Sequence, residues 1–386
     1  MSTAKAEPLC ADSMTAALAG FVERREVPGV LAVVTDVDHT IYTGALGLAG
    51  RRSGMPMTGD TVFRIASMTK LVTSLAVMML VDEQAVDLDA PLSKYLPAWR
   101  QPDVLTMFDH YSGEYRTRPA HKAVTVRELL SHTSGYGYWF LDRRLFELVE
   151  GEPDLLRPPF LIDEPGTRFN YGTSTDVLGQ IIEPVTGKTL ERFFAERIFK
   201  PLNMRDTSFE LPINPDRLAS VFTRTADGFS EQEMETTAPA PRGGGGLYST
   251  AEDYCRLMRV FLNKGECRGK RLLSASACEA MTRNQIGDLY AQVQTTAFPE
   301  RSNDFIFMNG TQKFGFGLAI ESADQPGGRP AGTASWAGIF NTYFWIDFEN
   351  EFAAVVLMQM RPFADVHCVE VCRRFERALY DCLNAS

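Results

Sequence analysis

Apolar residues recur at helical spacing near the start of this chain, and strand-like runs follow. The residues that share the helical face are Met14, Ala17, Leu18 and Phe21. Asp12 and Ser13 precede this face as possible caps, which predicts a helix that starts there. Pro28-Gly29 predicts where it stops. The runs VLAVVTD and TIYTGALG, joined by residues 36–39, then predict a β-hairpin.

The run from Met68 to Val81 is apolar on nearly every side. That pattern is typical of a helix buried in the middle of a protein, because a surface helix keeps one polar face. Any charged residue within this run, such as Lys70, is therefore expected to lie close to the buried interior of the protein.

The middle of the chain reads mostly as helix and loop. The sequence becomes irregular after the turn-rich segment 87–97, and a capping box at Thr125-x-x-Glu128 predicts a short helix. Two more helices are predicted over 176–186, stopped by Gly187, and over 190–200, stopped by Pro201. A further helix is expected after Ser249-Thr250, with Glu252 or Asp253 completing a capping box.

Strand signals return near the C-terminus in NTYFWID and FAAVVLMQM, before a helix over about 365–383. Strands at both ends with helices between them predict an α+β fold, in which one antiparallel sheet is built from N- and C-terminal segments and flanked by helices. We expect a tail at 1–12, an α/β lobe from 13–84 and 236–386, and a mainly helical lobe at 85–235. A chain of 386 residues is long enough for two lobes that share a cleft.

Composition excludes several classes of function. The formal net charge of -10 argues against binding to nucleic acid or to an anionic membrane surface, so a small or neutral substrate is expected. No stretch reaches the roughly 18 apolar residues that a membrane helix needs, and the N-terminus lacks a signal-peptide core. The protein is therefore expected in the cytoplasm.

The cysteines and the run of glycines could be taken for functional motifs, but their spacing and sequence context do not favour that interpretation. The seven cysteines are odd in number and contain no Cys-x-x-Cys pair, so neither a disulfide framework nor a zinc ribbon is expected. Cys368 and Cys372 are spaced like two metal ligands, but they share an apolar helical stripe and are expected in the core. Gly243 to Gly246 lacks the lysine of a phosphate loop, which leaves close backbone approach or flexibility.

Candidate chemistry lies in RIASMTK, where Ser67 precedes Lys70 by three residues. Residues three apart share a helix face, so the hydroxyl and the amine can meet. Serine is a poor nucleophile without a group that takes its proton, and a lysine can do so where burial disfavours its charged form. The alternative is that the pair is a surface serine beside a solvated lysine, with no catalytic role. The spacing alone does not decide, because Ser2-x-x-Lys5 has it too and lies in a polar tail.

Other nucleophile systems find less support. The Gly-x-Ser-x-Gly elbow of α/β-hydrolases is absent, and the stretch 172–176 fails at its last position. A Ser-His-Asp triad would have to use one of five histidines, of which only His132 has a distinctive setting. His132 is expected to be a structural hydrogen-bonding residue. There is no His-x-x-x-His motif for a metalloenzyme.

Six motifs in order add up to a resemblance. They are RIASMTK, LDAPLSKYLP, TVRELLSHTSG, FNYGTSTDVLGQIIEPVTG, GGGGLYSTAEDYCRLM and SWAGIFN. Together they resemble the serine β-lactamase and penicillin-binding-protein superfamily in its class C branch, and look closest to family VIII carboxylesterases and related acyltransferases. The resemblance spans the chain from about residue 14. It implies a β-lactamase-like (DD-peptidase) fold with the active site in the cleft between the lobes.

The resemblance also implies roles for individual residues. Ser67 matches the acylated nucleophile, Lys70 its proton acceptor, and Tyr171 the tyrosine that activates the serine and later the deacylating water. The backbone N–H groups of Ser67 and Ile339 match the oxyanion hole, where such donors are typically worth about 3 kcal/mol each. No cofactor or metal is implied.

Departures from the family pattern point to the substrate. Trp336-Ala337-Gly338 stands where β-lactam-processing members have Lys-Thr-Gly, and exchanging a cation for an indole favours a neutral ester. Tyr171-Gly172-Thr173 replaces Tyr-x-Asn, so the amide that reads a peptide-like side chain is missing. Trp336 and Gly338 are expected at the pocket edge.

Tyr138 and Trp139 resemble aromatic residues of the acyl pocket in the esterases, although ordinary packing under a loop would also explain them. The predicted function is hydrolysis of short-chain carboxylic esters. The alternatives are acyl transfer from the same acyl-enzyme, a β-lactamase or D-amino-acid peptidase, and a non-catalytic binding protein.

Overall fold

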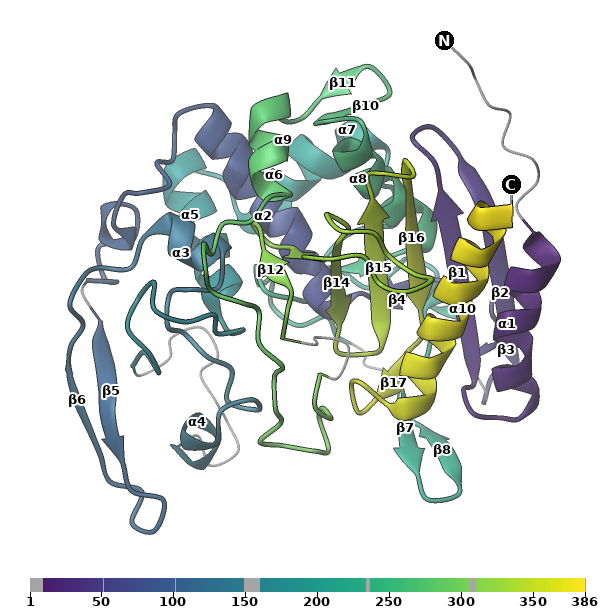
Figure 1. Ribbon diagram of the computed structural model, residues 1–386, viewed down its shortest axis with the longest axis horizontal. Coiled ribbons are helices and arrows are strands. Elements are labelled where there is room, and N and C mark those ends of the chain that lie inside the picture. Colours follow the sequence, from purple (N-terminus) through teal and green to yellow (C-terminus); the bar gives the residue numbers. More distant parts are fainter. Residues whose placement is uncertain are drawn as a thin grey trace.

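The computed structural model describes residues 10–50, 52–100, 102–148, 160–233, 237–305 and 310–385. Within them, the central sheet has eight strands (Figure 1). In sheet order they are β12 (Lys313–Phe314), β13 (Ala319–Ile320), β14 (Ala334–Gly338), β15 (Thr342–Asp347), β16 (Phe352–Leu357), β1 (Gly29–Thr35), β2 (Thr40–Gly50) and β3 (Met55–Pro56). All neighbours pair antiparallel, and β1 lies between β2 and the C-terminal β16. The sheet predicted from both ends of the chain is therefore confirmed.

The predicted hairpin is β1–β2, with Val33 opposite Thr43. Its turn is closed by Asp36, whose carboxylate accepts hydrogen bonds from the N–H groups of Asp38 and His39. Every residue of β1 and of β16 is buried. This explains why the sequence of each strand is a nearly continuous apolar run, without the alternation of apolar and polar residues that a half-exposed strand shows.

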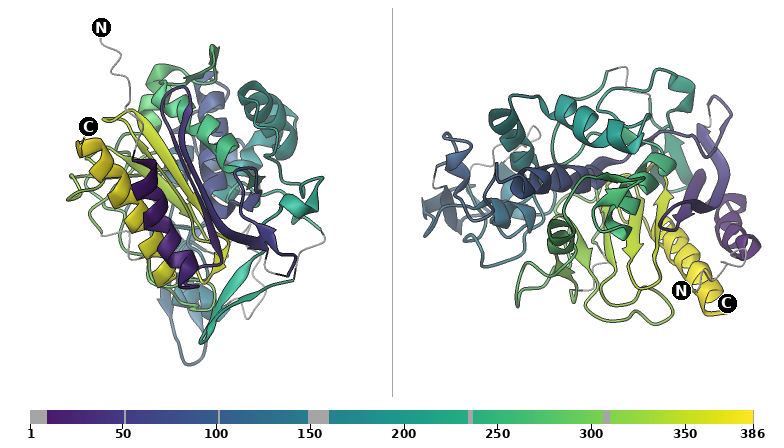
Figure 2. Two further views of the ribbon diagram at one scale, coloured as in Figure 1. Left: turned by 90° about the vertical axis from the view of Figure 1, so that its right-hand side faces the viewer. Right: turned by 90° about the horizontal axis from the view of Figure 1, so that it is seen from above.

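Helices α1 (Ala11–Glu23) and α10 (Val366–Ala385) pack together on one face of the sheet (Figure 2). The predicted apolar face of α1 is buried through Met14, Leu18 and Phe21. Helix α1 stops at Glu23, before Pro28, because the chain turns through a left-handed Arg25 with φ 58°. Cys368 and Cys372 lie in the buried stripe of α10, which confirms them as core residues.

Helices α2 (Thr69–Asp82) and α8 (Ala251–Leu262) cover the other face of the sheet (Figure 2). Every residue of α2 from Thr69 to Leu80 is buried, as its all-round apolar pattern predicted. Lys70 lies in its first turn and is 1% exposed. Helix α2 therefore brings a buried amine to the edge of the sheet.

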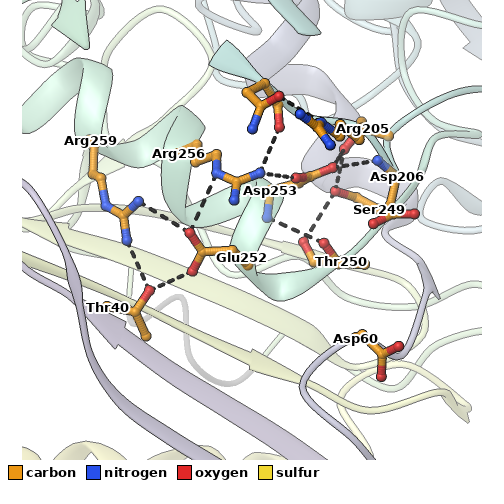
Figure 3. Close-up of polar contacts among 12 residues, drawn as sticks. Thr40, Asp60, Arg205, Asp206, Ser249, Thr250, Glu252, Asp253, Arg256 and Arg259 are labelled. Carbon is orange, nitrogen blue, oxygen red and sulfur yellow. Dashed lines mark hydrogen bonds and ion pairs between the residues drawn. The ribbon is translucent and has the colours of Figure 1, made fainter. Parts of the chain in front are cut away.

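A buried polar network fastens α8 to the hairpin (Figure 3). The guanidinium of Arg259, 2% exposed, donates to Thr35 Oγ1 at 2.6 Å and to Thr40 Oγ1 at 2.9 Å. It also pairs with Glu252 at 3.3 Å. Thr250 caps α8 as predicted, but the Asp253 carboxylate accepts from the Asp206 N–H rather than closing a capping box. Removing one partner from such a network leaves a buried charge uncompensated, which is costly.

The remaining helices surround α2 and the β12 edge of the sheet (Figure 1). They are α3 (Val126–Leu130), α4 (Arg143–Leu148), α5 (Ser174–Thr186), α6 (Leu190–Phe194), α7 (Lys200–Leu202) and α9 (Ala275–Met281). The Thr125–Glu128 capping box of α3 is confirmed. The helix predicted to stop at Pro201 continues from α6 through a wider π turn and ends at the left-handed Asn203, φ 57°. Pro201 sits in the short last helix at a position that needs no N–H donor.

Two hairpins interrupt the region predicted as helix and loop. They are β5 (Asp103–Phe108) with β6 (Tyr115–Pro119), and β7 (Phe222–Thr225) with β8 (Gly228–Glu231). Their strands are largely exposed, so no buried alternation marks them in the sequence. Strand β7 also pairs with β17 (Met360–Arg361), which joins the middle region to the C-terminal half. The division into two lobes stays a prediction.

Short pairs complete the strands, β4 (Phe63–Arg64) with β9 (Tyr248–Ser249) and β10 (Glu266–Cys267) with β11 (Lys270–Arg271). Among the described residues, no helix has the length and apolar character that crossing a membrane requires.

Candidate active site

Ser67 lies on a 3₁₀ turn, Ala66–Met68, that leads directly into α2. Ala66 has a left-handed backbone, φ 46°, which is uncommon for a residue with a side chain and typical of strained functional turns. The end of β14 presses against this turn. A Cβ on Gly338 would lie 2.4 Å from the Ile65 carbonyl oxygen, so glycine permits the close approach. Gly338 thus positions the turn and borders neither cavity described below.

The amine of Lys70 faces Ser67 from one turn along. Lys70 Nζ is 3.3 Å from Ser67 Oγ, 2.9 Å from the Tyr138 hydroxyl and 2.6 Å from the Gly244 carbonyl oxygen. The rings of Tyr138 and Tyr171 lie 5.2 Å and 5.0 Å from Nζ. Lys70 is therefore desolvated, and its amine is surrounded by three oxygen atoms within hydrogen-bond distance.

Tyr138 and Gly244 are both held by one buried carboxylate, Asp176 of α5. Asp176 Oδ1 accepts from the Gly244 N–H at 3.0 Å, and Oδ2 accepts from the Tyr138 hydroxyl at 3.4 Å. Burial raises the pKa of Tyr138 well above its usual value, and the charge of Asp176 adds to the shift. Tyr138 therefore stays protonated and donates to Asp176, so its oxygen accepts from Lys70.

The glycine run packs closely against α5. A Cβ on Gly243 would lie 2.3 Å from the Thr175 carbonyl oxygen, and one on Gly244 would lie 2.3 Å from Asp176 Oδ2. Close backbone approach, one of the two sequence interpretations, is therefore the reason for these glycines. The sequence did not point to Asp176, because an acid in the first turn of a helix ordinarily serves the helix dipole.

Tyr171 reaches the same space from the segment before α5. Its hydroxyl accepts from the Trp336 indole N–H at 3.3 Å, and the two rings meet edge to face with centroids 4.8 Å apart. Its ring faces Lys70, as noted, and it borders a cavity with Ser67. A Cβ on Gly172 would lie 2.1 Å from the Tyr136 carbonyl oxygen, which explains the glycine after Tyr171.

His132 packs behind Tyr171, with ring centroids 5.1 Å apart. The Gly172 N–H donates to His132 Nδ1 at 3.5 Å, so the ring proton belongs on Nε2, which lies 3.4 Å from Thr175 Oγ1. Burial lowers the pKa of His132 well below its usual value, and the charge of Lys70 adds to the effect. His132 is thus a neutral ring that supports Tyr171, and its geometry fits the structural role expected from the sequence.

Two cavities meet at Ser67. The smaller, about 20 Å³, is lined by aromatic side chains that include Phe140, Tyr171, Phe305 and Trp336. The larger, about 230 Å³, is bordered by Tyr138, Trp139 and several arginines. Ser67 and Ile339 border both. The structure therefore brings together every predicted site residue except Gly338, which packs behind the turn that carries Ser67.

Comparison with known proteins agrees with this geometry. Residues 14–371 match the β-lactamase family. The chain belongs to that family. It is 29% identical to esterase EstB of Burkholderia gladioli over 84% of each chain, and 28% identical to monacolin J acid methylbutanoyltransferase of Aspergillus terreus over 95% of each chain.

The solved structures show the same fold. A mutant simvastatin synthase from Aspergillus terreus superimposes with a TM-score of 0.83 at 27% identity, covering 100% of both chains. The β-lactamase-like fold predicted from the motifs is thus confirmed, and the relatives of this chain include both esterases and acyltransferases.

Proposed function

We propose that this protein is a serine carboxylesterase that hydrolyses short-chain esters through an acyl-enzyme on Ser67. The observation that supports this most directly is the 3.3 Å approach of the buried Lys70 amine to the Ser67 hydroxyl, at the junction of two cavities. A desolvated amine in contact with a serine is an activated nucleophile system.

The hydrogen bonds around Lys70 favour its role as the base. The Gly244 carbonyl can only accept, and the Tyr138 hydroxyl donates to Asp176, so both take an N–H from Lys70. A neutral amine has two N–H groups, and these two acceptors use both. Its lone pair is then directed at Ser67, the third neighbour, and can take the hydroxyl proton.

Attack of Ser67 Oγ on the ester carbon forms a tetrahedral intermediate, whose oxyanion would be held by the N–H groups of Ser67 and Ile339. The proton taken by Lys70 passes to the leaving alkoxide, and the C–O bond to the alcohol breaks. Water then attacks the acyl-enzyme and gives its proton to Lys70, whose amine lies 5.0 Å from the centre of the Tyr171 ring. Ser67 recovers its proton as the acid leaves, so the cycle closes without a cofactor.

The volume of the small cavity limits the size of the acyl group that it can hold. About 20 Å³ is roughly the space of one water-sized probe, enough for an acetyl methyl group but not for a long chain. The Trp336 indole occupies the position where β-lactam-processing relatives place a cation, so a β-lactamase activity is not part of this proposal.

Acyl transfer is the second candidate, and the similarity to an acyltransferase along 95% of the chain favours it. Both reactions share the acyl-enzyme and differ only in whether water or an alcohol attacks it. Product analysis of an activated acetyl ester with and without added alcohol separates them. Hydrolysis gives acetate in both cases, whereas a transferase converts most of the acyl group to the new ester.

Intact-mass measurement tests the proposal itself. A reactive fluorophosphonate is expected to add one phosphonyl group to the protein and none to Ser67→Ala. Ser2→Ala is the matched control, because Ser2 shares the Ser-x-x-Lys spacing; it should be labelled like the parent. Labelling that persists in Ser67→Ala would mean that another residue is the reactive nucleophile, whereas no labelling and no turnover of aryl acetates would make the chain a non-catalytic member of the fold. Rapid opening of a chromogenic cephalosporin would instead indicate a β-lactamase.

A further inference from the structure

The larger cavity beside Ser67 has an unbalanced charge. Four arginines border it, namely Arg64, Arg242, Arg301 and Arg361, and among the described residues around it the only carboxylate is that of Asp176. The chain as a whole carries a formal net charge of -10. Cations gathered at a nucleophile in an acidic protein create a local field that attracts anions.

Two of the charged groups that border this cavity already form hydrogen bonds with other groups of the protein. Arg64 is 6% exposed and donates to the Ala219 carbonyl at 3.0 Å. The Asp176 carboxylate is occupied by the Gly244 N–H and the Tyr138 hydroxyl. Three further guanidinium groups border the cavity, those of Arg242, Arg301 and Arg361, and they come from three separate segments of the chain.

Arg301 is the most confined of the three. Its guanidinium carbon lies 5.0 Å from the ring centroid of Phe140 and 5.6 Å from that of Trp139, so the aromatic rings fix its plane. Its Nε is buried without a hydrogen-bond partner, and neither Arg301 nor Arg242 forms an ion pair with a carboxylate of the described residues. Leaving a buried donor unpaired costs free energy, which suits a site completed by a ligand.

The arginines also act on one another. Burial lowers the pKa of Arg301 to about 10, and repulsion from Arg361 and Arg242 adds to this. Arg361 stacks on Phe340, with its guanidinium carbon 4.9 Å from the ring centroid. An anion between these groups would relieve both the repulsion and the missing hydrogen bond. Planar guanidinium groups match carboxylate and phosphate oxygens in geometry.

We propose that the cluster of Arg242, Arg301 and Arg361 binds an anionic group, a carboxylate or a phosphate, on the alcohol part of the ester. This inference rests on the proposed function and names the substrate class of that same site. The apolar cavity has room only for a short acyl group, so the alcohol part must extend into the larger cavity. The expectation of a neutral substrate relied on the net charge of the whole chain and on Trp336, whereas the cavity is bordered by cations from other segments.

Matched aryl acetates test the proposal. The substrates are 4-carboxyphenyl acetate, its neutral analogue 4-carbamoylphenyl acetate, and 4-phosphonooxyphenyl acetate, assayed with the parent, Arg301→Met, Arg242→Gln and the exposed control Arg283→Met. Comparing ratios between variants cancels the differing reactivity of the leaving groups. We expect kcat/KM for an anionic ester, relative to the neutral one, to fall about 10- to 100-fold in Arg301→Met, mainly through KM. A smaller fall is expected in Arg242→Gln, and none in the control.

The outcomes separate this inference from the proposed function. If the neutral ester is hydrolysed by the parent but neither arginine variant changes the ratio, the anion site is refuted while the esterase stands. An equal loss for neutral and anionic esters would also refute it. If no ester is cleaved, the proposed function fails first. Should Arg301→Met not fold, Arg242→Gln and Arg301→Lys decide, since Lys keeps the charge and should retain part of the ratio. The carboxylate and phosphate esters show which anion is preferred.

Discussion

The two cavities that meet at Ser67 differ in size and in charge. The smaller is walled by aromatic rings and holds about 20 Å³, whereas the larger holds about 230 Å³ and is bordered by four arginines. Rings packed edge to face leave little freedom, so under the proposed function the small cavity would select the acyl group by size. The guanidinium groups would select the alcohol part by charge. The proposal thus assigns recognition of two different properties of an ester to the two sides of Ser67.

The largest effect on activity is expected from replacing Lys70, because the cleavage of every ester depends on the same proposed base. Lys70→Met should lower kcat/KM by about 10³-fold or more for neutral and anionic aryl acetates alike, because the proton acceptor is lost. Lys70→Arg should be equally inactive, since arginine keeps the charge but does not deprotonate. Steady-state kinetics with both ester types measures this. Activity within tenfold of the parent in either variant would contradict the role of Lys70.

Asp176→Asn should have the next largest effect. Without the carboxylate, the Tyr138 hydroxyl is free to donate to Lys70 and occupy its lone pair, so kcat should fall about 10- to 100-fold with little change in KM. Tyr138→Phe should lower kcat in the same direction, and the two losses should be less than additive because the residues act through one contact. The pH profile of kcat, measured on the neutral ester, distinguishes this from general destabilisation. Fully additive losses would indicate separate roles.

Enlarging the aromatic cavity should change size selection and leave charge selection alone. Phe305→Leu removes part of a ring that is 4% exposed and lies against Tyr171 and Phe363. The preference for an acetyl over a butyryl ester should fall by about tenfold, since two methylene groups are worth about 1.6 kcal/mol. Arg242→Gln is the control, for which this ratio should not change, because Arg242 borders only the larger cavity. A shift in both variants would mean that the cavities are not independent.

The smallest effect concerns stability rather than turnover. Because the pKa of His132 is lowered in the folded protein, the unfolded chain binds a proton first as the pH falls. Stability should therefore be complete above about pH 6.5 and decline below it, by up to about 1.4 kcal/mol per pH unit from this group. His132→Asn suits the left-handed backbone, φ 55°, and should flatten that decline. Thermal unfolding between about pH 7.5 and 5 measures it, and identical slopes would exclude His132.

The sequence was informative wherever a pattern was local. The all-round apolar run of α2, the spacing of Ser67 and Lys70, and the Thr125 capping box each depend on neighbours within a few residues, and each is found as expected. It was less informative for the exposed hairpins β5–β6 and β7–β8, whose strands bury too little to show alternation. The fold was indicated by the resemblance that the six motifs carry, because they span most of the chain and occur in the order of the family.

What the sequence determined by itself is thus the family, the sheet built from both ends of the chain, and a serine one helical turn from a buried lysine. What only the tertiary structure decided is which groups surround that pair. Asp176, Tyr138 and Gly244 converge on Lys70 from three segments, and Arg242, Arg301 and Arg361 converge on the larger cavity from three more. The reason is physical: helical spacing fixes contacts along one element, whereas charges brought together by packing leave no periodic trace in the sequence.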